Sequence, residues 1–215
     1  MGNDGMTEER WLNTNTAPEL IDYVAQQVSE RKLRLFACAA CRRIFSVMQY
    51  EASRKAVESS ERFADEQAEW KDLLIMAYEA KELADTAEHL RLMGWNAART
   101  AALAGAQNAR EAARRASEAA ADADLVREHF GNPFRLLNLS PNVLSWQDKT
   151  VFRLAQAAYE HRILPAGTLG NTRLAILADA LEEAGCTDEQ ILTHLRSGGD
   201  HYRGCFVVDA LLGKS

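Results

Sequence analysis

The sequence contains few cysteines and prolines and no long apolar run. Four of its 215 residues are Cys and four are Pro, and so few cysteines exclude a scaffold held together by disulfides. No uncharged stretch reaches the roughly 20 residues that a membrane-spanning helix requires. The first residues lack the basic start and apolar stretch of a signal peptide. The sequence therefore predicts a cytoplasmic protein with no membrane partner.

An excess of basic residues is also missing. The chain has 25 Lys and Arg against 31 Asp and Glu, a formal net charge of -6. Because affinity for nucleic acid comes mostly from Lys and Arg at the phosphates, this balance argues against a nucleic-acid partner. Metalloprotease, nucleophile-elbow and dinucleotide-binding motifs are absent from the sequence as well. The usual enzyme classes therefore have no motif support.

Helical periodicity runs through most of the chain, and no stretch shows a convincing alternation of period two. Thr16–Glu19, with a proline inside it, predicts the start of a helix, and a second helix is predicted over 29–50. Another helix is predicted over 172–184, with Gly185 as its stop, and Thr187–Gln190 has the pattern of a capping box. The predicted fold class is all-α.

The middle of the chain is rich in alanine. From residue 69 to residue 130, apolar or small residues recur about every 3.5 positions, which is typical of helices packed along a coiled-coil seam. We predict a long antiparallel helical hairpin over 68–130 that turns near Met93–Gly94; the alternative is one long helix through this glycine. The two chain ends, 1–67 and 131–215, are then predicted to form one compact helical domain.

All four cysteines lie in these terminal segments. Cys38 and Cys41 form a C-x-x-C motif, and on a helix both thiolates can reach one ion. Zn²⁺ takes four Cys or His ligands tetrahedrally, and C-x-x-C is a frequent half of such a site. The second half is predicted to come from His201 and Cys205, so the candidate zinc ligands are these four residues.

Alternatives to this metal site remain open. Cys186 and His194 are substitutes for the second pair of ligands. In a different interpretation, Cys38, Cys41 and Cys186 are small buried apolar side chains, as free cysteines commonly are. A redox or disulfide role is a third alternative.

The function predicted from these features is a non-enzymatic helical interaction or scaffold module, with a possible structural zinc site. Its partner is an unknown protein or a second copy bound through the Ala-rich hairpin. The alternative is a small enzyme or anion-binding protein. A glycine-rich turn before a helix can bind an anion, and a histidine beside it can transfer protons. The residues of that alternative site are His201, Arg203 and Asp209, with Asp179 and Glu183 as further members.

Four sequence blocks carry a resemblance. They are Leu33–Arg43 (LRLFACAACRR), Phe130–Arg135 (FGNPFR), Leu177–Cys186 (LADALEEAGC) and His201–Asp209 (HYRGCFVVD). In these blocks the chain resembles a group of uncharacterised bacterial proteins, and the Ala-rich middle lies outside the match. Ala40 stands where the group usually has a third Cys, and Phe206 where it usually has Trp. The resemblance implies no activity.

Overall fold

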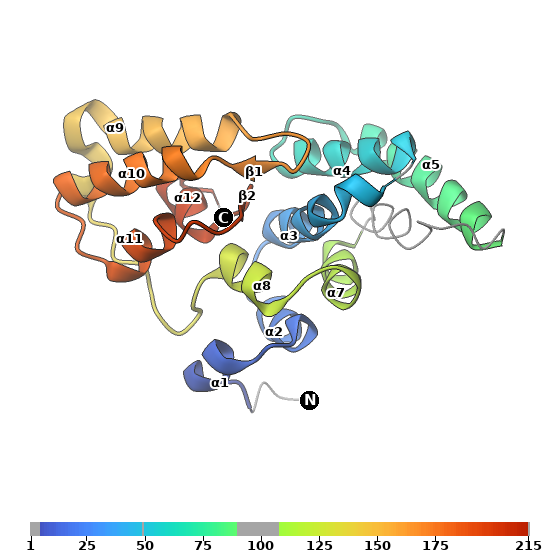
Figure 1. Ribbon diagram of the computed structural model, residues 1–215, viewed down its shortest axis with the longest axis horizontal. Helices are drawn as coiled ribbons and strands as arrows, with labels where there is room; N and C mark the ends of the chain where they lie inside the picture. The colour runs from blue at the N-terminus through green and yellow to red at the C-terminus, as the bar shows by residue number, and fades with distance from the viewer. Residues whose placement is uncertain (1–4, 49, 90–107, 215) are drawn as a thin grey trace. The chain divides into compact units, whose positions relative to one another are not determined.

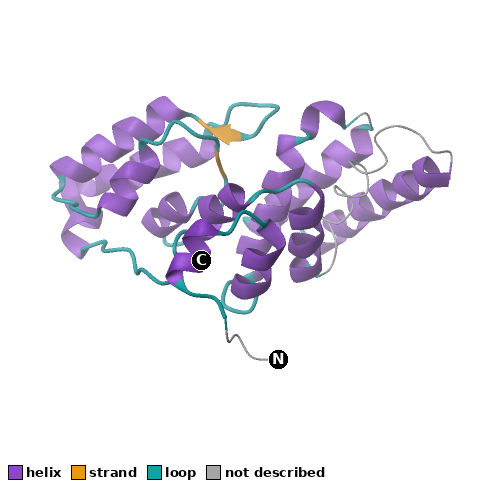
Figure 2. Ribbon diagram, turned by 60° about the horizontal axis from the view of Figure 1, so that its bottom comes forward, coloured by secondary structure: helices purple, strands orange, loops and turns teal. Residues whose placement is uncertain are grey.

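The computed structural model describes residues 5–48, 50–89 and 108–214 (Figure 1). Within these residues the protein is mostly helical and contains one very small two-stranded sheet (Figure 2), which confirms the prediction of an all-α fold. Contacts divide the chain into an N-terminal unit, Met1–Arg127, and a C-terminal unit, Glu128–Ser215. No helix in the described part of the chain is long and apolar enough to cross a membrane.

The N-terminal unit is organised around its third helix, which is buried along most of its length. The Ser29 side chain accepts a hydrogen bond from the Lys32 backbone N–H and so caps the start of this helix. The elements of the unit are α1 (Glu8–Asn13), α2 (Ala17–Val24), α3 (Glu30–Arg43), η1 (Phe45–Val47), α4 (Glu51–Ala64), α5 (Trp70–His89), α7 (Ala109–Ala119) and the start of α8 (Ala123–Phe130). Helices α4 and α7 pack against α3, and α5 packs against α4.

The predicted helix over 29–50 is wrong in its extent. Helix α3 ends at Arg43, and Ile44 leaves helical geometry before the short turn of η1. This turn places the Phe45 ring over the Arg42 guanidinium, whose central carbon lies 4.5 Å from the ring centre. This contact between residues three positions apart is local, but helical periodicity does not report where the helix ends.

Helix α7 lies within the Ala-rich segment, and it packs through its alanine face. Its alanines at 109, 112, 113 and 116 are buried, and the helix packs against α3 and α2. Small side chains on this face let the backbones of neighbouring helices approach closely. Residues 109–119, which the sequence analysis places in the hairpin, therefore contribute to the core of the N-terminal unit.

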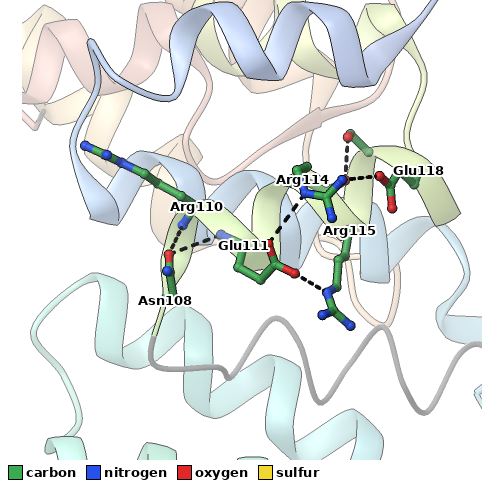
Figure 3. Close-up of polar contacts among 7 residues, drawn as sticks. Asn108, Arg110, Glu111, Arg114, Arg115 and Glu118 are labelled. Carbon is green, nitrogen blue, oxygen red and sulfur yellow. Dashed lines mark hydrogen bonds and ion pairs between the residues drawn. The ribbon is translucent and has the colours of Figure 1, made fainter. Parts of the chain in front are cut away.

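The other face of α7 carries ion pairs (Figure 3). Arg114 Nη1 lies 2.6 Å from Glu118 Oε1, and both Arg114 and Arg115 pair with Glu111. Asn108 caps the helix by accepting from the backbone N–H groups of its first turn. Such pairs at spacings of three and four stabilise a helix and keep this face in solvent, which leaves the alanine face for the core.

The predicted turn near Met93–Gly94 lies outside the described residues, and the hairpin over 68–130 stays a prediction. The predicted partition into 1–67 with 131–215 also stays a prediction. The structure itself places the boundary between its two units after Arg127.

The C-terminal unit consists of α9 (Pro141–Glu160), β1 (Thr168–Leu169), α10 (Asn171–Glu183), α11 (Glu189–Leu195), β2 (His201–Tyr202) and α12 (Phe206–Leu212), following the end of α8. Helices α10 and α12 both pack against α9 (Figure 1). Their shared core includes Val151, Leu174, Leu177, Leu181 and Val208. This core holds the short elements α11, β2 and α12 in place.

The ends of α10 and α11 test two local predictions. Gly185 has a φ of +88°, and the Cys186 N–H donates to the Leu181 carbonyl, so the predicted glycine stop of α10 is confirmed. The predicted capping box at Thr187–Gln190 is wrong by one residue. Asp188 is the N-cap of α11, and its carboxylate accepts from two backbone N–H groups of the first turn.

Candidate metal centre

Four side chains of the C-terminal unit converge on one point. They are Glu128, His194, His201 and Cys205, and the ligand atoms that they offer all lie within 4.8 Å of one another. Carboxylate oxygen, imidazole nitrogen and thiolate sulfur are all ligands of transition metals in proteins. The structure therefore contains a group that could hold a metal ion.

Each of the four side chains comes from a different element. Glu128 lies in the last turn of α8, His194 in the last turn of α11, and His201 on β2. Strand β2 is held by β1, with Leu169 opposite His201. Cys205 follows four residues later as the N-cap of α12, after a turn that passes through Gly204. The centre therefore joins segments that are far apart in the sequence.

Two atoms of the group, Glu128 Oε2 and His194 Nε2, each contact two other ligand atoms. Glu128 Oε2 lies 3.0 Å from His194 Nε2 and 3.0 Å from His201 Nδ1. His194 Nε2 also lies 3.2 Å from Cys205 Sγ. Ligands of a tetrahedral ion at the usual zinc distances are about 3.3–3.6 Å apart. Shifts of a few tenths of an ångström would adapt these three contacts to such an ion.

The contacts of His194 differ from those of the histidine in a catalytic triad, whereas His201 has Ser197 Oγ and Glu128 Oε2 on opposite ring nitrogens. In a triad, the nucleophile and the orienting carboxylate contact opposite nitrogens of the histidine ring. Here Glu128 and Cys205 both contact Nε2 of His194. Two partners on the same nitrogen of His194 leave that ring without the relay of a triad and are compatible with ligands around a common ion.

The centre is mostly buried. Glu128, His201 and Cys205 are buried, and the His194 side chain is 17% exposed. Burial alone raises the pKa of Glu128, but its hydrogen bonds with His194 and His201 outweigh burial and lower this pKa to about 2. With an ion bound, the Glu128 carboxylate and a deprotonated Cys205 would supply two negative charges. A divalent cation would neutralise them, as a buried site requires.

Two further contacts orient the ligands. The Tyr202 backbone N–H donates to Glu128 Oε1 at 3.1 Å, which leaves Oε2 to face the histidines. Ser197 Oγ lies 3.2 Å from Nε2 of His201, so the two ring nitrogens of His201 have different partners. Supporting contacts of this kind are typical of metal ligands in proteins.

The predicted ligands divide between the two units. His201 and Cys205 belong to the group, and His194, one of the predicted substitutes, belongs to it as well. Cys38 and Cys41 lie on α3 in the N-terminal unit and are not members of the group. The four-residue set predicted from the sequence stays a prediction, and the group that the structure assembles shares two of its residues.

Cys38 and Cys41 have the environment of buried apolar side chains. Both are buried on α3, and Cys38 Sγ lies 3.9 Å from the Val57 carbonyl oxygen. Burial, together with the nearby Glu61 carboxylate, raises the pKa of Cys38 to about 12, and burial also raises the pKa of Cys41. Both pKa values lie above the ordinary range of a thiol, which disfavours the thiolate that a nucleophile requires. Cys186 is buried in the core of the C-terminal unit.

Two residues of the alternative anion site, Arg203 and Asp179, have other partners. The Arg203 guanidinium lies 5.0 Å from the centre of the Tyr159 ring, and its Nε donates to the Tyr159 carbonyl. Asp179 forms an ion pair with Arg196 at 2.7 Å, while Asp209 is buried on α12. Of that predicted set, His201 alone belongs to the convergent group.

Sequence reasoning missed Glu128. The glutamate precedes His194 by 66 positions, and no motif spacing connects residues so far apart. In the sequence, Glu128 is marked only by its position two residues before the Phe130–Arg135 block. Because its carboxylate enters the group only through packing of the C-terminal unit, periodicity could not identify it.

Gly131 keeps the end of α8 close to this centre. Its φ is +63°, and a Cβ at this position would lie 2.7 Å from Cδ2 of Phe206. The Phe206 ring in turn lies 4.4 Å from the His194 ring, centre to centre. Gly131 therefore supplies both a left-handed backbone and the space in which Phe206 packs.

We expect Gly131→Ala to lower the free energy of unfolding by about 2–4 kcal/mol, since it combines left-handed strain with overpacking. Gly213→Ala is the matched control, because Gly213 has a φ of +65° and no neighbouring atom within 4 Å of its Cβ position. This control is expected to lose only the backbone part, about 1–2 kcal/mol. Urea unfolding of both variants measures the difference, and equal losses would contradict the role given to the Phe206 contact.

Comparisons with known protein families, curated proteins and solved structures find no match for this chain. The resemblance carried by the four sequence blocks stays a prediction.

Proposed function

We propose that this protein is a non-enzymatic helical interaction module whose C-terminal unit is held together by one structural zinc ion. The ligands are Glu128, His194, His201 and Cys205. The observation that carries the proposal is the convergence of four ligand atoms from four elements within 4.8 Å. Zinc suits this mixed set of oxygen, nitrogen and sulfur donors, because it binds all three and accepts tetrahedral geometry.

Closure of the centre favours a structural role over a catalytic one. A catalytic zinc site typically has three protein ligands and leaves a fourth position to water or substrate. Here four protein ligands are available, and three of them are buried. The ion would connect the ends of α8 and α11 to β2 and to the start of α12, and so stabilise the short elements of the unit.

The interaction role is proposed for the exposed side chains of α5, within the predicted hairpin over 68–130, with another protein or a second copy as the partner. Exposed side chains of α5 support it: Trp70, Ile75 and Tyr78 are 39%, 52% and 64% exposed. Large apolar side chains on a solvent-facing helix are typical of interaction surfaces when they gather on it. Light scattering over a range of protein concentrations separates the two partners, because only self-association raises the measured mass.

Zinc content tests the proposed centre directly. We expect one zinc ion per chain in protein purified under reducing conditions without chelator, and a loss of that zinc in Cys205→Ser, since serine is a poor zinc ligand. Elemental analysis of the intact chain measures both.

Two control variants identify the ligands. Cys186→Ser removes another buried thiol of the C-terminal unit, and the double variant Cys38→Ser/Cys41→Ser removes the C-x-x-C pair. Both are expected to keep zinc. Metal-free wild-type protein with four titratable thiols would contradict the proposal, and so would zinc that is lost from the double variant but kept by Cys205→Ser.

A further inference from the structure

We propose that Ser197 acts as a positioning residue for the zinc centre, because its hydroxyl holds His201 through Nε2 while Nδ1 faces the other ligands. This inference rests on the proposed function, because it assigns a role in the same site. A neutral imidazole carries one N–H and one free lone pair, and only the lone pair can bind an ion. The affinity of the centre for zinc therefore depends on which nitrogen of His201 holds the proton.

The surroundings of His201 separate its two nitrogens. Nδ1 faces the interior of the centre, 3.0 Å from Glu128 Oε2. Nε2 faces Ser197 Oγ at 3.2 Å. The His201 side chain is 2% exposed, whereas Ser197 is exposed. The ligand atom is therefore Nδ1, and the serine hydroxyl is the partner of the remaining nitrogen.

A hydroxyl suits this position because it both donates and accepts hydrogen bonds. Without metal, Nδ1–H donates to Glu128 and the Ser197 hydroxyl donates to Nε2. When zinc binds at Nδ1, one proton leaves Nδ1 for solvent and one is taken up at Nε2, so the ring stays neutral. The hydroxyl then rotates and accepts from Nε2–H. Ser197 thus satisfies His201 in both states.

The backbone holds Ser197 in this position. Its N–H donates to the His194 carbonyl at 3.1 Å, so the residue is tied to two of the four ligands. The next residue, Gly198, has a φ of +68°, and its carbonyl accepts from Asn171 Nδ2 at 3.1 Å. The loop after α11 is therefore anchored at the start of α10. These backbone contacts fix the position of the Ser197 hydroxyl.

Zinc affinity of the full-length chain tests the inference. We expect Ser197→Ala to bind zinc about 10–100-fold more weakly than the wild type, which is the usual effect of removing such a supporting contact. Ser197→Thr keeps the hydroxyl and is expected to restore affinity close to the wild-type value. Competition with a chromophoric chelator measures all three proteins, with the metal alone as the probe.

A second measurement reports the proton itself. Long-range ¹H–¹⁵N spectra of the imidazole rings are expected to show Nε2–H on His201 in the zinc-bound wild type. Equal zinc affinity of Ser197→Ala and wild type, or zinc bound at Nε2 of His201, would overturn this inference and leave the zinc centre standing. Wild-type protein that binds no zinc would instead overturn the proposed function, and the inference with it.

Discussion

Chelation of zinc is expected to unfold much of the C-terminal unit while the N-terminal unit stays folded. All four proposed ligands lie in Glu128–Ser215, and they join elements as short as the two residues of β2. A ligand that binds only the folded state stabilises it by about 4 kcal/mol when its free concentration is a thousandfold above Kd. Structural zinc sites bind the ion very tightly, so free zinc can readily exceed Kd by this factor. Removal of zinc is therefore expected to lower the free energy of unfolding by about 4 kcal/mol or more.

Amide hydrogen exchange followed by mass spectrometry measures this effect unit by unit. With an excess of chelator, peptides that cover α11, β2 and α12 are expected to lose protection, and peptides that cover α3 and α4 to keep it. Cys205→Ser is the control, because a protein that holds no zinc cannot respond to the chelator. Complete removal of zinc from the wild type with unchanged exchange in α11 and α12 would contradict a structural role for the ion.

Removal of the Glu61 carboxylate is expected to destabilise the N-terminal unit strongly. Arg42 and Glu61 form a two-pronged ion pair, with Nε 2.9 Å from Oε1 and Nη2 2.8 Å from Oε2, and both side chains are buried. Burial by itself lowers the pKa of Arg42, but the hydrogen bonds with Glu61 outweigh it and raise this pKa. Glu61→Ala would leave a buried guanidinium without this partner, a change that costs about 3–5 kcal/mol.

The neighbouring Glu58 provides a matched control on the same helix. Its carboxylate lies 4.0 Å from Arg42 Nη2, and its side chain is 53% exposed. Because exposed ion pairs contribute only about 0–1 kcal/mol, Glu58→Ala is expected to change stability little. Chemical unfolding of the two variants gives the comparison. A loss in Glu61→Ala as small as that in Glu58→Ala would show that the buried pair contributes no net stability.

Helices could be predicted from the sequence where their limits are set by residues within the helix or directly beside it. Helix α10 has both a clear apolar period and a glycine stop, and the structure ends it where Gly185 requires. Helix α3 ends at Arg43, where Phe45 contacts Arg42, and apolar periodicity continues past this point without marking the end. Alanines of α7 repeat at helical spacing, but the spacing did not reveal that they pack against α3.

The candidate metal centre shows the same division. The sequence by itself determined that the chain is helical, and it predicted His201 and Cys205 as ligands of one ion because they would lie one helical turn apart. In the structure this segment is β2 and a turn, and both residues still belong to the group. Only the tertiary structure decided which residues join them, because Glu128 and His194 enter the centre through the packing of α8 and α11 in the C-terminal unit. Spacing identifies ligands that share one turn or one helix. Ligands that converge from separate elements are selected by the burial of apolar side chains elsewhere, which brings those elements together.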